Sequence, residues 1–284
     1  MNLSYLKELD VYLEMALKED IGDGDHTTLS TIPEDLQGKA ELKVKDDGII
    51  AGMELAPLIF AKVDPALRLH ALIKDGDPVK KGDIAFYVIG NTRSIVTAER
   101  LVLNCMQRMS GIATLTHHYT QRLAGLKTRL LDTRKTTPNF RIFEKWAVHI
   151  GGGINHRFGL FDMILIKDNH IDYAGSIEKA ITGAQAYLKK TGKNMQIEIE
   201  ARNLEDVEKI LRFEGIQRIL LDNFSPEKIK EALSLIKGAV ETEASGGITY
   251  ENLREYGETG VDFISSGALT HSVKSLDLSL KAMF

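Results

Sequence analysis

Apolar, strand-like stretches alternate with helix-like stretches through most of the second part of this 284-residue chain. The strand candidates are residues 129–133, 162–166, 196–200, 218–222, 239–245 and 262–266. Helical periodicity over 176–189, 204–213 and 226–237 separates most of the later candidates. Strand–helix repetition gives parallel strands with right-handed crossovers, in an open sheet or a closed barrel. Since there are fewer candidates than the eight strands of a complete barrel, we expect an incomplete α/β barrel.

The first part of the chain has a different pattern. An apolar helical face that includes Leu9, Leu13 and Leu17 predicts a first helix that ends near Asp20. Short apolar runs between residues 39 and 96, separated by Gly, Asp and Pro, indicate a strand-rich lobe. From Ala98 the spacing of apolar residues predicts a long amphipathic helix. We place the domain boundary close to the start of that helix.

The composition excludes several classes of protein. A formal net charge of −4 argues against general nucleic-acid binding, which needs a basic face. No apolar run approaches the roughly 20 residues that span a bilayer, and the first 20 residues are acidic and amphipathic, unlike a signal peptide. The lone cysteine, Cys105, permits no internal disulfide and lies on the apolar stripe of the long helix. We therefore expect a reducing, cytoplasmic setting.

Each predicted strand of the second part ends on a chemically useful group. These groups are Arg134–Lys135, Lys167, Glu200, Asp222, Ser245-Gly246-Gly247 and Ser266-Gly267. In a β/α barrel the carboxyl ends of the strands form one rim, where the active site is built. The ordinary alternative is that loops are polar in any protein, which is a sufficient account of any single position.

Four cations fall close together in the sequence: Arg134, Lys135, Arg157 and Lys167. Arginine recognises a carboxylate with two parallel hydrogen bonds, whereas lysine acts as a compact point charge. The two arginines are therefore suited to bind carboxylates. The two lysines are suited to neutralise negative charge or to bind phosphate. A surface salt bridge is the commoner fate of such residues, but a pocket for a small, highly anionic substrate accounts for all four together.

The remaining groups favour phosphate and cation chemistry. Small residues after the last two strands allow backbone N–H groups to approach an anion closely, with His271 as a further phosphate contact or a helix cap. Glu200 and Asp222 could bind Mg²⁺, hold ribose hydroxyls, stabilise a cationic sugar or orient a lysine. Glu198 points to the same side as Glu200. His156 and His170 are candidates for acid–base groups or for hydrogen-bonding partners.

Several longer motifs resemble those of one enzyme family. They are Glu99–Asn104, Ser110–Thr114, Asp132–Pro138, Asn155–Arg157, Leu165–His170, Glu198–Glu200, Leu221–Asn223 and Ala244–Ile248. Together they resemble quinolinate phosphoribosyltransferase, also called carboxylating nicotinate-nucleotide pyrophosphorylase. The likeness extends from Glu19 to the end of the chain and is most specific over 132–170. Asn139 and Trp146 stand where that family usually has Gly and Tyr, and neither difference removes a charged group.

The resemblance implies an N-terminal α/β sandwich domain over residues 1–97, onto which residues 272–284 return, and a catalytic α/β barrel domain over 98–271. It implies that the 5-phosphoribosyl group of phosphoribosyl pyrophosphate is transferred to quinolinate with decarboxylation. The products are nicotinate mononucleotide, pyrophosphate and CO₂, in de novo NAD biosynthesis. Mg²⁺ is the implied cofactor.

The resemblance also implies roles for single residues. The implied catalytic residues are Lys135, Lys167, Glu200 and Asp222, of which Glu200 and Asp222 hold the metal directly or through water. The quinolinate site is Arg134, His156, Arg157 and Lys167, with Thr133 and Lys135 nearby, and the phosphate site is Ser245, Gly246, Gly247, Ser266, Gly267, Ala268 and His271. Arg100 is expected to enter the site of a neighbouring subunit, so the implied assembly is a homodimer or a hexamer built from dimers.

Other interpretations stay open on the sequence alone. A pyridine phosphoribosyltransferase that accepts nicotinate would release no CO₂, and two arginine clamps argue instead for two carboxylates. A barrel aldolase or isomerase with a phosphate-bearing substrate would use Lys167 as a Schiff-base lysine. A carrier module would explain residues 76–82, which resemble the turn of lipoyl- or biotinyl-type domains, but no lysine lies in a matching hairpin.

Overall fold

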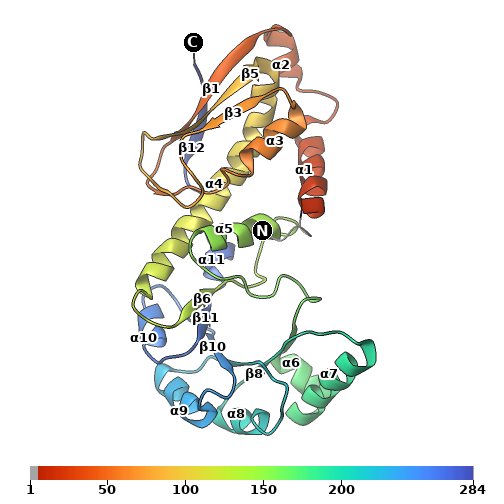
Figure 1. Cartoon of the computed structure of the whole chain (residues 1–284), viewed down its shortest axis with the longest axis vertical. Helices are drawn as coiled ribbons and strands as arrows, with labels where there is room; N and C mark the ends of the chain where they lie inside the picture. The colour runs from red at the N-terminus through yellow and green to blue at the C-terminus, as the bar shows by residue number, and fades with distance from the viewer. Residues whose placement is uncertain (1–5, 284) are drawn as a thin grey trace. The chain divides into compact units, whose positions relative to one another are not determined.

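The computed structural model describes residues 6–283, so residues 1–5 and 284 of the predicted N-terminal domain lie outside the described residues. The chain divides into two compact units (Figure 1). The first unit comprises Met1–His117, Thr136–Gly152 and Leu269–Phe284, and the second comprises His118–Lys135 and Gly153–Ala268. Each unit is therefore assembled from segments that are separated in the sequence.

A six-stranded parallel sheet forms the second unit. Its strands are β6 (Arg129–Leu131), β7 (Ile164–Ile166), β8 (Ile197–Ala201), β9 (Arg218–Asp222), β10 (Glu241–Ser245) and β11 (Phe263–Ser265). Their order in the sheet is β6-β11-β10-β9-β8-β7, so the strands follow one another around an arc that is open between β6 and β7. The predicted incomplete α/β barrel of six strands is confirmed.

Helices connect the barrel strands, and local sequence signals determine where they begin. They are α6 (Asp168–Ala174), α7 (Ile177–Thr191), α8 (Leu204–Ile210), α9 (Pro226–Ile236) and α10 (Leu253–Gly257). The side chains of Ser176, Asn203 and Ser225 accept a backbone N–H in the first turns of α7, α8 and α9. This N-capping satisfies donors that have no partner inside the helix. Buried residues such as Ile181, Val207 and Ile229 then pack the helices.

The interior face of the barrel sheet is polar, unlike the branched aliphatic interior that is usual for such barrels. Glu198 of β8 lies opposite Arg218 of β9 in the register, and Glu243 of β10 lies opposite Leu220. Alternation along a strand puts Glu198 and Glu200 on one face and Ile197 and Ile199 on the other. The charged side chains therefore face inward, toward the rim and the space beneath it.

The first unit is built on a four-stranded antiparallel sheet in the order β12-β1-β5-β3. The strands are β1 (Gln37–Val44), β3 (Arg68–Ala71), β5 (Ile84–Asn91) and β12 (Leu278–Met283), with a separate pair β2 (Gly48–Ile49) and β4 (Pro78–Val79). The helices of its N-terminal segment before β5 are α1 (Leu6–Ile21), α2 (His26–Thr31) and α3 (Ala56–Val63). Phe60 of α3 meets Phe86 of β5 edge to face, with ring centroids 6.1 Å apart, which anchors the helix to the sheet.

A long helix, α4 (Thr92–Arg122), runs from the first unit into the second. It begins six residues before Ala98, the predicted start, because it follows β5 directly and the Asn91 side chain accepts the N–H of Ser94. Helix α5 (Arg141–Ile150) ends against α4, where a Cβ on Gly151 would lie 2.5 Å from the carbonyl oxygen of Ala113. Only glycine permits this approach. The short helix α11 (Ala268–His271) follows the barrel.

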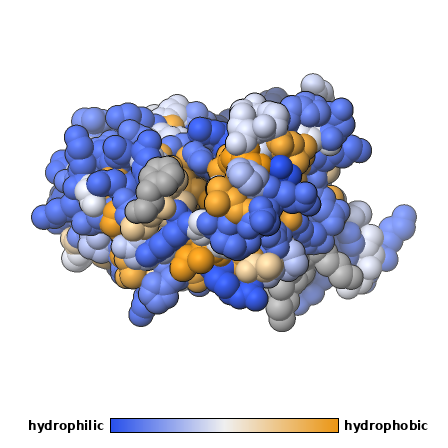
Figure 2. Space-filling model, turned by 90° about the horizontal axis from the view of Figure 1, so that it is seen from above, coloured by the Kyte–Doolittle hydropathy of each residue, from blue (hydrophilic) through white to orange (hydrophobic). Residues whose placement is uncertain are grey.

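The surface is mostly hydrophilic on the face shown in Figure 2, where hydrophobic residues occur in small groups. Within residues 6–283, no helix is both long and apolar enough to cross a membrane.

Candidate functional site at the rim of the barrel

Most of the predicted site residues lie at the carboxyl ends of the barrel strands. Thr133, Arg134 and Lys135 follow β6; Lys167 follows β7; Glu200 and Asp222 lie at the ends of β8 and β9; Ser245, Gly246 and Gly247 end and follow β10; Ser266, Gly267 and Ala268 follow β11. Because the six strands are parallel neighbours, these ends form one rim. Arg100 of α4 and His271 of α11 belong to the other unit.

Lys167 and Glu200 form the central ion pair of the rim. Lys167 Nζ donates to Glu200 Oε1 at 2.8 Å, and the other oxygen of Glu200 accepts the N–H of Asp168 at 2.9 Å. The ring of His170 accepts the N–H of Lys167, so the start of α6 is fixed by two side chains. Glu200 is buried, whereas 48% of the Lys167 side chain is exposed. The ammonium group is therefore held in place yet accessible to a ligand.

Asp222 adds a second carboxylate close to Glu200. Burial raises the pKa of Asp222, and the negative charge of Glu200 raises it further. Asn223 Nδ2 donates to Asp222 Oδ2 at 2.7 Å, which orients the carboxylate. Two neighbouring carboxylates that are partly withdrawn from water favour a cation between them or beside them.

Arg134 and Arg157 lie near each other at the same rim. Burial lowers the pKa of the Arg157 guanidinium, and the positive charge of Arg134 lowers it further. The nearby carboxylates of Glu198, Asp162 and Glu200 oppose this effect. Arg157 Nη1 also donates to the carbonyl oxygen of Met163 at 3.2 Å. Two guanidinium groups held together against their repulsion are suited to an anionic ligand that carries more than one charge.

The loop after β10 depends on glycine. Gly246 has φ +90°, and a Cβ there would lie 2.3 Å from Asn223 Oδ1. Gly247 has φ +64°, and Asn223 itself has φ +56°. The N–H of Asn223 donates to the carbonyl oxygen of Ser245 at 2.8 Å, which joins this loop to the end of β9. The tight, side-chain-free backbone leaves room for an anion to approach the main chain.

Asp132, which was not among the predicted site residues, organises the loop that carries His156 and Arg157. It is fully buried, and its carboxylate accepts Asn155 Nδ2 at 2.7 Å and the N–H of His156 at 2.8 Å. The N–H of Asp132 in turn donates to the carbonyl oxygen of Ile154. An aspartate directly after the apolar run Leu130–Leu131 was the sequence signal that could have revealed this role.

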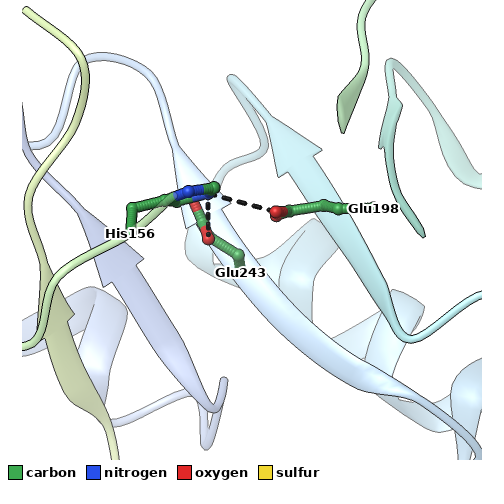
Figure 3. A group of neighbouring side chains, drawn as sticks. All are labelled: His156, Glu198 and Glu243. Atoms are coloured by element: carbon green, nitrogen blue, oxygen red, sulfur yellow. Dashed lines mark ion pairs between the residues drawn. The ribbon is translucent and has the colours of Figure 1, made fainter. Parts of the chain in front are cut away.

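Beneath the rim, His156 meets two buried glutamates (Figure 3). Its Nε2 lies 3.1 Å from Glu198 Oε2 and 3.4 Å from Glu243 Oε2, and the other ring nitrogen, Nδ1, accepts the N–H of Arg157 at 2.6 Å. Arg218 lies under the two carboxylates, with Nη1 3.2 Å from Glu243 Oε2 and 3.9 Å from Glu198 Oε2. Glu243 was missed from the sequence, although it precedes Ser245 by two residues, as Glu198 precedes Glu200.

The His156–Glu198–Glu243 cluster holds a proton at neutral pH. Burial disfavours a charged His156, but hydrogen bonds and charge from Glu198 and Glu243 outweigh it and raise its pKa to about 9. Burial and the charge of Glu243 raise the pKa of Glu198. The Arg157 N–H favours an unprotonated Nδ1, in which case the proton resides on a carboxylate. The proton therefore belongs to the cluster rather than to one residue.

In either arrangement Nε2 carries a hydrogen and faces the two glutamates. Within the described residues, the side chains of His156, Glu198 and Glu243 are close enough together to hold one metal ion. A metal on Nε2 would require that nitrogen to give up its hydrogen, while the N–H of Arg157 requires the same of Nδ1. Arg218 also already supplies positive charge, so this cluster is a hydrogen-bonded ion cluster and not a metal centre.

Glu200 and Asp222 fit a different cation site. Both oxygens of Glu200 and one oxygen of Asp222 already accept protein hydrogen bonds, so few carboxylate lone pairs remain for a metal. Mg²⁺ commonly keeps several waters and takes only one or two protein carboxylates together with phosphate oxygens. The donor set therefore suits Mg²⁺ that is bound mainly through water and a phosphorylated substrate.

A cavity of about 420 Å³ lies along the open edge of the sheet, beside β7 and α7. Its lining is mostly apolar and includes Leu160, Met163, Leu165 and Ala184. Of the four clustered cations, Arg157 lines it. The rim, rather than this cavity, therefore has the charges that an anionic substrate needs.

Comparisons with known proteins agree in family. The N-terminal domain of quinolinate phosphoribosyl transferase matches residues 25–110, and the C-terminal domain matches residues 112–281. Quinolinate phosphoribosyltransferase (decarboxylating) 1b of Nicotiana tabacum is 48% identical over 289 residues, covering 96% of this chain and 82% of that protein. Chloroplastic nicotinate-nucleotide pyrophosphorylase (carboxylating) of Arabidopsis thaliana is 48% identical with the same coverage. The crystal structure of NadC from Streptococcus pyogenes has a TM-score of 0.92 at 39% identity, covering 100% of both chains.

Proposed function

The chain belongs to the quinolinate phosphoribosyltransferase family, and we propose that it transfers a phosphoribosyl group from phosphoribosyl pyrophosphate to quinolinate with loss of CO₂. The products are nicotinate mononucleotide and pyrophosphate, in the de novo synthesis of NAD. The observation that carries this proposal is the closeness of Arg134 and Arg157 at a rim that also holds Lys167. A rigid dicarboxylate offsets the repulsion between the two arginines in a protein of net negative charge.

In this proposal the two arginines and Lys167 bind and orient quinolinate, with His156 and Thr133 at the same end and Lys135 at the edge. Lys135 is exposed after β6, where it is accessible to the diphosphate. Arginine pairs that grip both carboxylates fix the ring plane, so that the pyridine nitrogen faces the sugar. Such positioning lowers the barrier because the reactants no longer have to be oriented during the reaction.

The phosphoribosyl group of the second substrate fits the part of the rim at the ends of β8, β9, β10 and β11. The backbone N–H groups of Ser245–Gly247 and Ser266–Ala268 are suited to the 5-phosphate, with His271 as a further contact. Glu200 and Asp222 face the ribose, where their negative charge stabilises the positive charge that develops on the sugar. We propose that these two carboxylates also hold Mg²⁺, mainly through water; when bound, the ion offsets the charge of the leaving diphosphate.

Two steps, phosphoribosyl transfer and decarboxylation, make up the proposed reaction. The pyridine nitrogen attacks the anomeric carbon, and the carbon–oxygen bond to pyrophosphate breaks with its electron pair leaving on oxygen. The nitrogen then carries positive charge, so it stabilises the electron pair that remains at C2 when the 2-carboxylate departs as CO₂. C2 finally takes up a proton. Lys167 remains charged throughout and serves to bind the anionic substrates.

We further propose that the active assembly is at least a homodimer, or a hexamer built from dimers, in which Arg100 enters the neighbouring subunit's site. Arg100 is exposed on α4, as a residue that serves another subunit must be before assembly. A cytoplasmic location is supported by the single, buried Cys105, whose thiol has its pKa raised to about 12 by burial and is inert. The chloroplastic name of the Arabidopsis relative describes that protein.

The test is to incubate the protein with phosphoribosyl pyrophosphate and Mg²⁺, together with quinolinate labelled in the 2-carboxylate or with nicotinate. Release of labelled CO₂ with stoichiometric nicotinate mononucleotide is expected from quinolinate alone. Turnover of nicotinate without CO₂ would replace the proposal with a non-decarboxylating transferase. Borohydride trapping of a substrate at Lys167 would favour an aldolase instead.

A further inference from the structure

Below the proposed quinolinate site, a continuous chain of contacts connects the barrel interior to Arg157. His156 Nε2 forms ion pairs with Glu198 and Glu243 (Figure 3). The other ring nitrogen of His156, Nδ1, accepts the N–H of Arg157. The side chain of His156 is 7% exposed, and those of Glu198 and Glu243 are 0% and 1% exposed. Each contact in the chain is therefore shielded from water.

Burial of these two carboxylates is costly, and folding does not require it. A barrel interior of similar volume is normally filled with aliphatic side chains, and replacing buried ion groups with such residues is often neutral or stabilising. Neither oxygen of Glu198 accepts a hydrogen bond from the described residues, so Glu198 is held by its ion pairs with His156 and Arg218. A group that is retained at this cost is a candidate for a functional role.

This chain of contacts ends at Arg157, which belongs to the proposed substrate site. Its backbone N–H is held by the His156 ring, and its Nη1 is held by the Met163 carbonyl oxygen. The next two backbone N–H groups, of Phe158 and Gly159, donate to Asp162. The loop beyond Arg157 is thus closed on itself, and its start is held to the barrel by the ring of His156 and by Asp132, which accepts the His156 N–H.

We propose that Glu198 and Glu243 are positioning residues that act through His156 to fix the Arg157 guanidinium for binding one carboxylate of the dicarboxylate substrate. This inference rests on the proposed function, because it concerns the group that is expected to bind quinolinate. Neither glutamate touches the substrate; their contacts are with His156 and Arg218. The glutamates hold the ring, the ring holds the Arg157 backbone, and the backbone orients the guanidinium.

Positioning and simple electrostatics predict opposite results. Glu198 places a negative charge near Arg157, and Glu198→Gln removes it. If Glu198 acted only through its charge, the loss would favour a doubly negative ligand, and quinolinate would bind more tightly. If Glu198 acts through His156, the ring loses its closer partner, Arg157 shifts, and quinolinate binds more weakly. The sign of the change therefore decides between the two roles.

The experiment compares the wild-type protein with each variant. It measures the dissociation constant of quinolinate by calorimetry, and it measures kcat and the KM for both substrates by turnover. Glu198→Gln and Glu243→Gln are each expected to weaken quinolinate binding about tenfold, within the range of coupling between contacting residues. KM for phosphoribosyl pyrophosphate should stay within about twofold, because only binding of one substrate is affected. Asp262→Asn is the control, since Asp262 accepts hydrogen bonds from Thr242, which is next to Glu243 on β10 but points to the opposite face of the sheet.

A double-mutant cycle tests the route through His156. His156→Asn places a side-chain oxygen near the position of Nδ1, which can still accept the Arg157 N–H, but the side chain is too short to reach the glutamates. It should weaken quinolinate binding as much as Glu198→Gln does, and adding Glu198→Gln to it should change nothing more. Additive effects, or tighter binding by Glu198→Gln, would overturn the proposal.

Failure of this inference can be distinguished from failure of the proposed function. If wild-type protein neither binds quinolinate nor releases CO₂ from it, the proposed function is wrong. If wild-type protein is active and the glutamine variants bind quinolinate normally, only the positioning role is wrong. If neither glutamine variant folds, His156→Asn decides between the outcomes, because both ring nitrogens of His156 are engaged by protein groups and leave none for the substrate. Normal quinolinate binding by this variant overturns the positioning role, and weakened binding with unchanged KM for the other substrate supports it.

Discussion

Lys167 Nζ and Glu200 Oε1 lie 2.8 Å apart at the rim of the barrel, where Lys167 follows β7 and Glu200 lies near the end of the neighbouring strand β8. Glu200 is fixed by a second bond to the N–H of Asp168, whereas the Lys167 side chain is partly exposed. The lysine can therefore turn toward a ligand without leaving a buried carboxylate wholly unpaired.

Replacing Lys167 should remove most activity and leave the fold intact. Lys167→Ala removes one positive charge from the site and leaves Glu200 to repel the substrates, so kcat/KM should fall by about a hundredfold or more. Thermal unfolding followed by circular dichroism should change little, because the side chain is half exposed. Lys209→Ala is the matched control, since Lys209 also pairs with a glutamate, Glu205, but on the surface of α8. Near-normal turnover of Lys167→Ala would contradict the site assignment.

Sharing of Arg100 between subunits can be tested by complementation. Arg100→Ala and Lys167→Ala should each be nearly inactive alone. When the two are unfolded together and reassembled, mixed dimers contain one site with both native residues, and activity should return. The measurement is turnover against mixing ratio, with each variant reassembled alone for comparison. No recovery in confirmed mixed dimers would show that Arg100 acts within its own subunit.

The buried cluster should make stability depend on pH. Its pKa of about 9 at His156 lies above the 6.5 of a free histidine, so the folded state retains a proton that the unfolded state loses first. The stabilisation is complete below pH 6.5 and is lost as pH rises through 9; it amounts to about 3 kcal/mol at most. Urea unfolding from pH 6 to 9.5 should show this decline, and His156→Asn should flatten it. An identical slope in wild type and variant would rule out the cluster as its source.

Gly246 should tolerate no side chain. Gly246→Ala combines φ +90° with a Cβ only 2.3 Å from Asn223 Oδ1, so we expect a loss of about 1–3 kcal/mol in stability. Because the loop would have to move, KM for phosphoribosyl pyrophosphate should rise more than KM for quinolinate. Gly183→Ala is the control: Gly183 lies inside α7 with nothing within 4 Å of an added Cβ. It should raise stability by about 0.5–1 kcal/mol.

Removal of the divalent cation should affect turnover but not the binding of quinolinate. With a chelator present, turnover should stop and return on addition of Mg²⁺, because the diphosphate leaving group needs a counter-charge. Calorimetric binding of quinolinate should be unchanged, since its two carboxylates are expected to bind the arginines and Lys167 and not the metal. Full activity without any divalent cation would contradict the proposed role of the two carboxylates.

The sequence was sufficient for the order and type of the barrel elements because these depend on local signals. Strand candidates at 218–222 and 239–245 match β9 (Arg218–Asp222) and β10 (Glu241–Ser245) closely. Side-chain caps such as Ser225 place the helix starts. The start of α4 was misplaced by six residues, because the apolar stripe begins later than the hydrogen-bonded helix that Asn91 caps.

Site residues that belong to a short sequence pattern could be predicted, whereas site residues whose role depends on burial could not. Glu200 and Asp222 were identified because they end strands, and Lys167 because it follows an apolar run. Asp132 and Glu243 were not identified, since their function lies in accepting hydrogen bonds from His156, which is distant in the sequence from Glu243. The local sequence does not indicate which residues become buried together in the folded protein.

The amino-acid sequence by itself therefore determined the succession of strands and helices, the gathering of cations near strand ends and the family likeness, because period, capping and composition are properties of neighbours along the chain. Only the tertiary structure decided that His156 joins two buried glutamates to Arg157, and that Arg134 lies near enough to Arg157 for its charge to lower the pKa of that guanidinium. Those relationships arise when the sheet curves and brings residues far apart in the sequence into a region of low dielectric constant, where contact and charge act strongly.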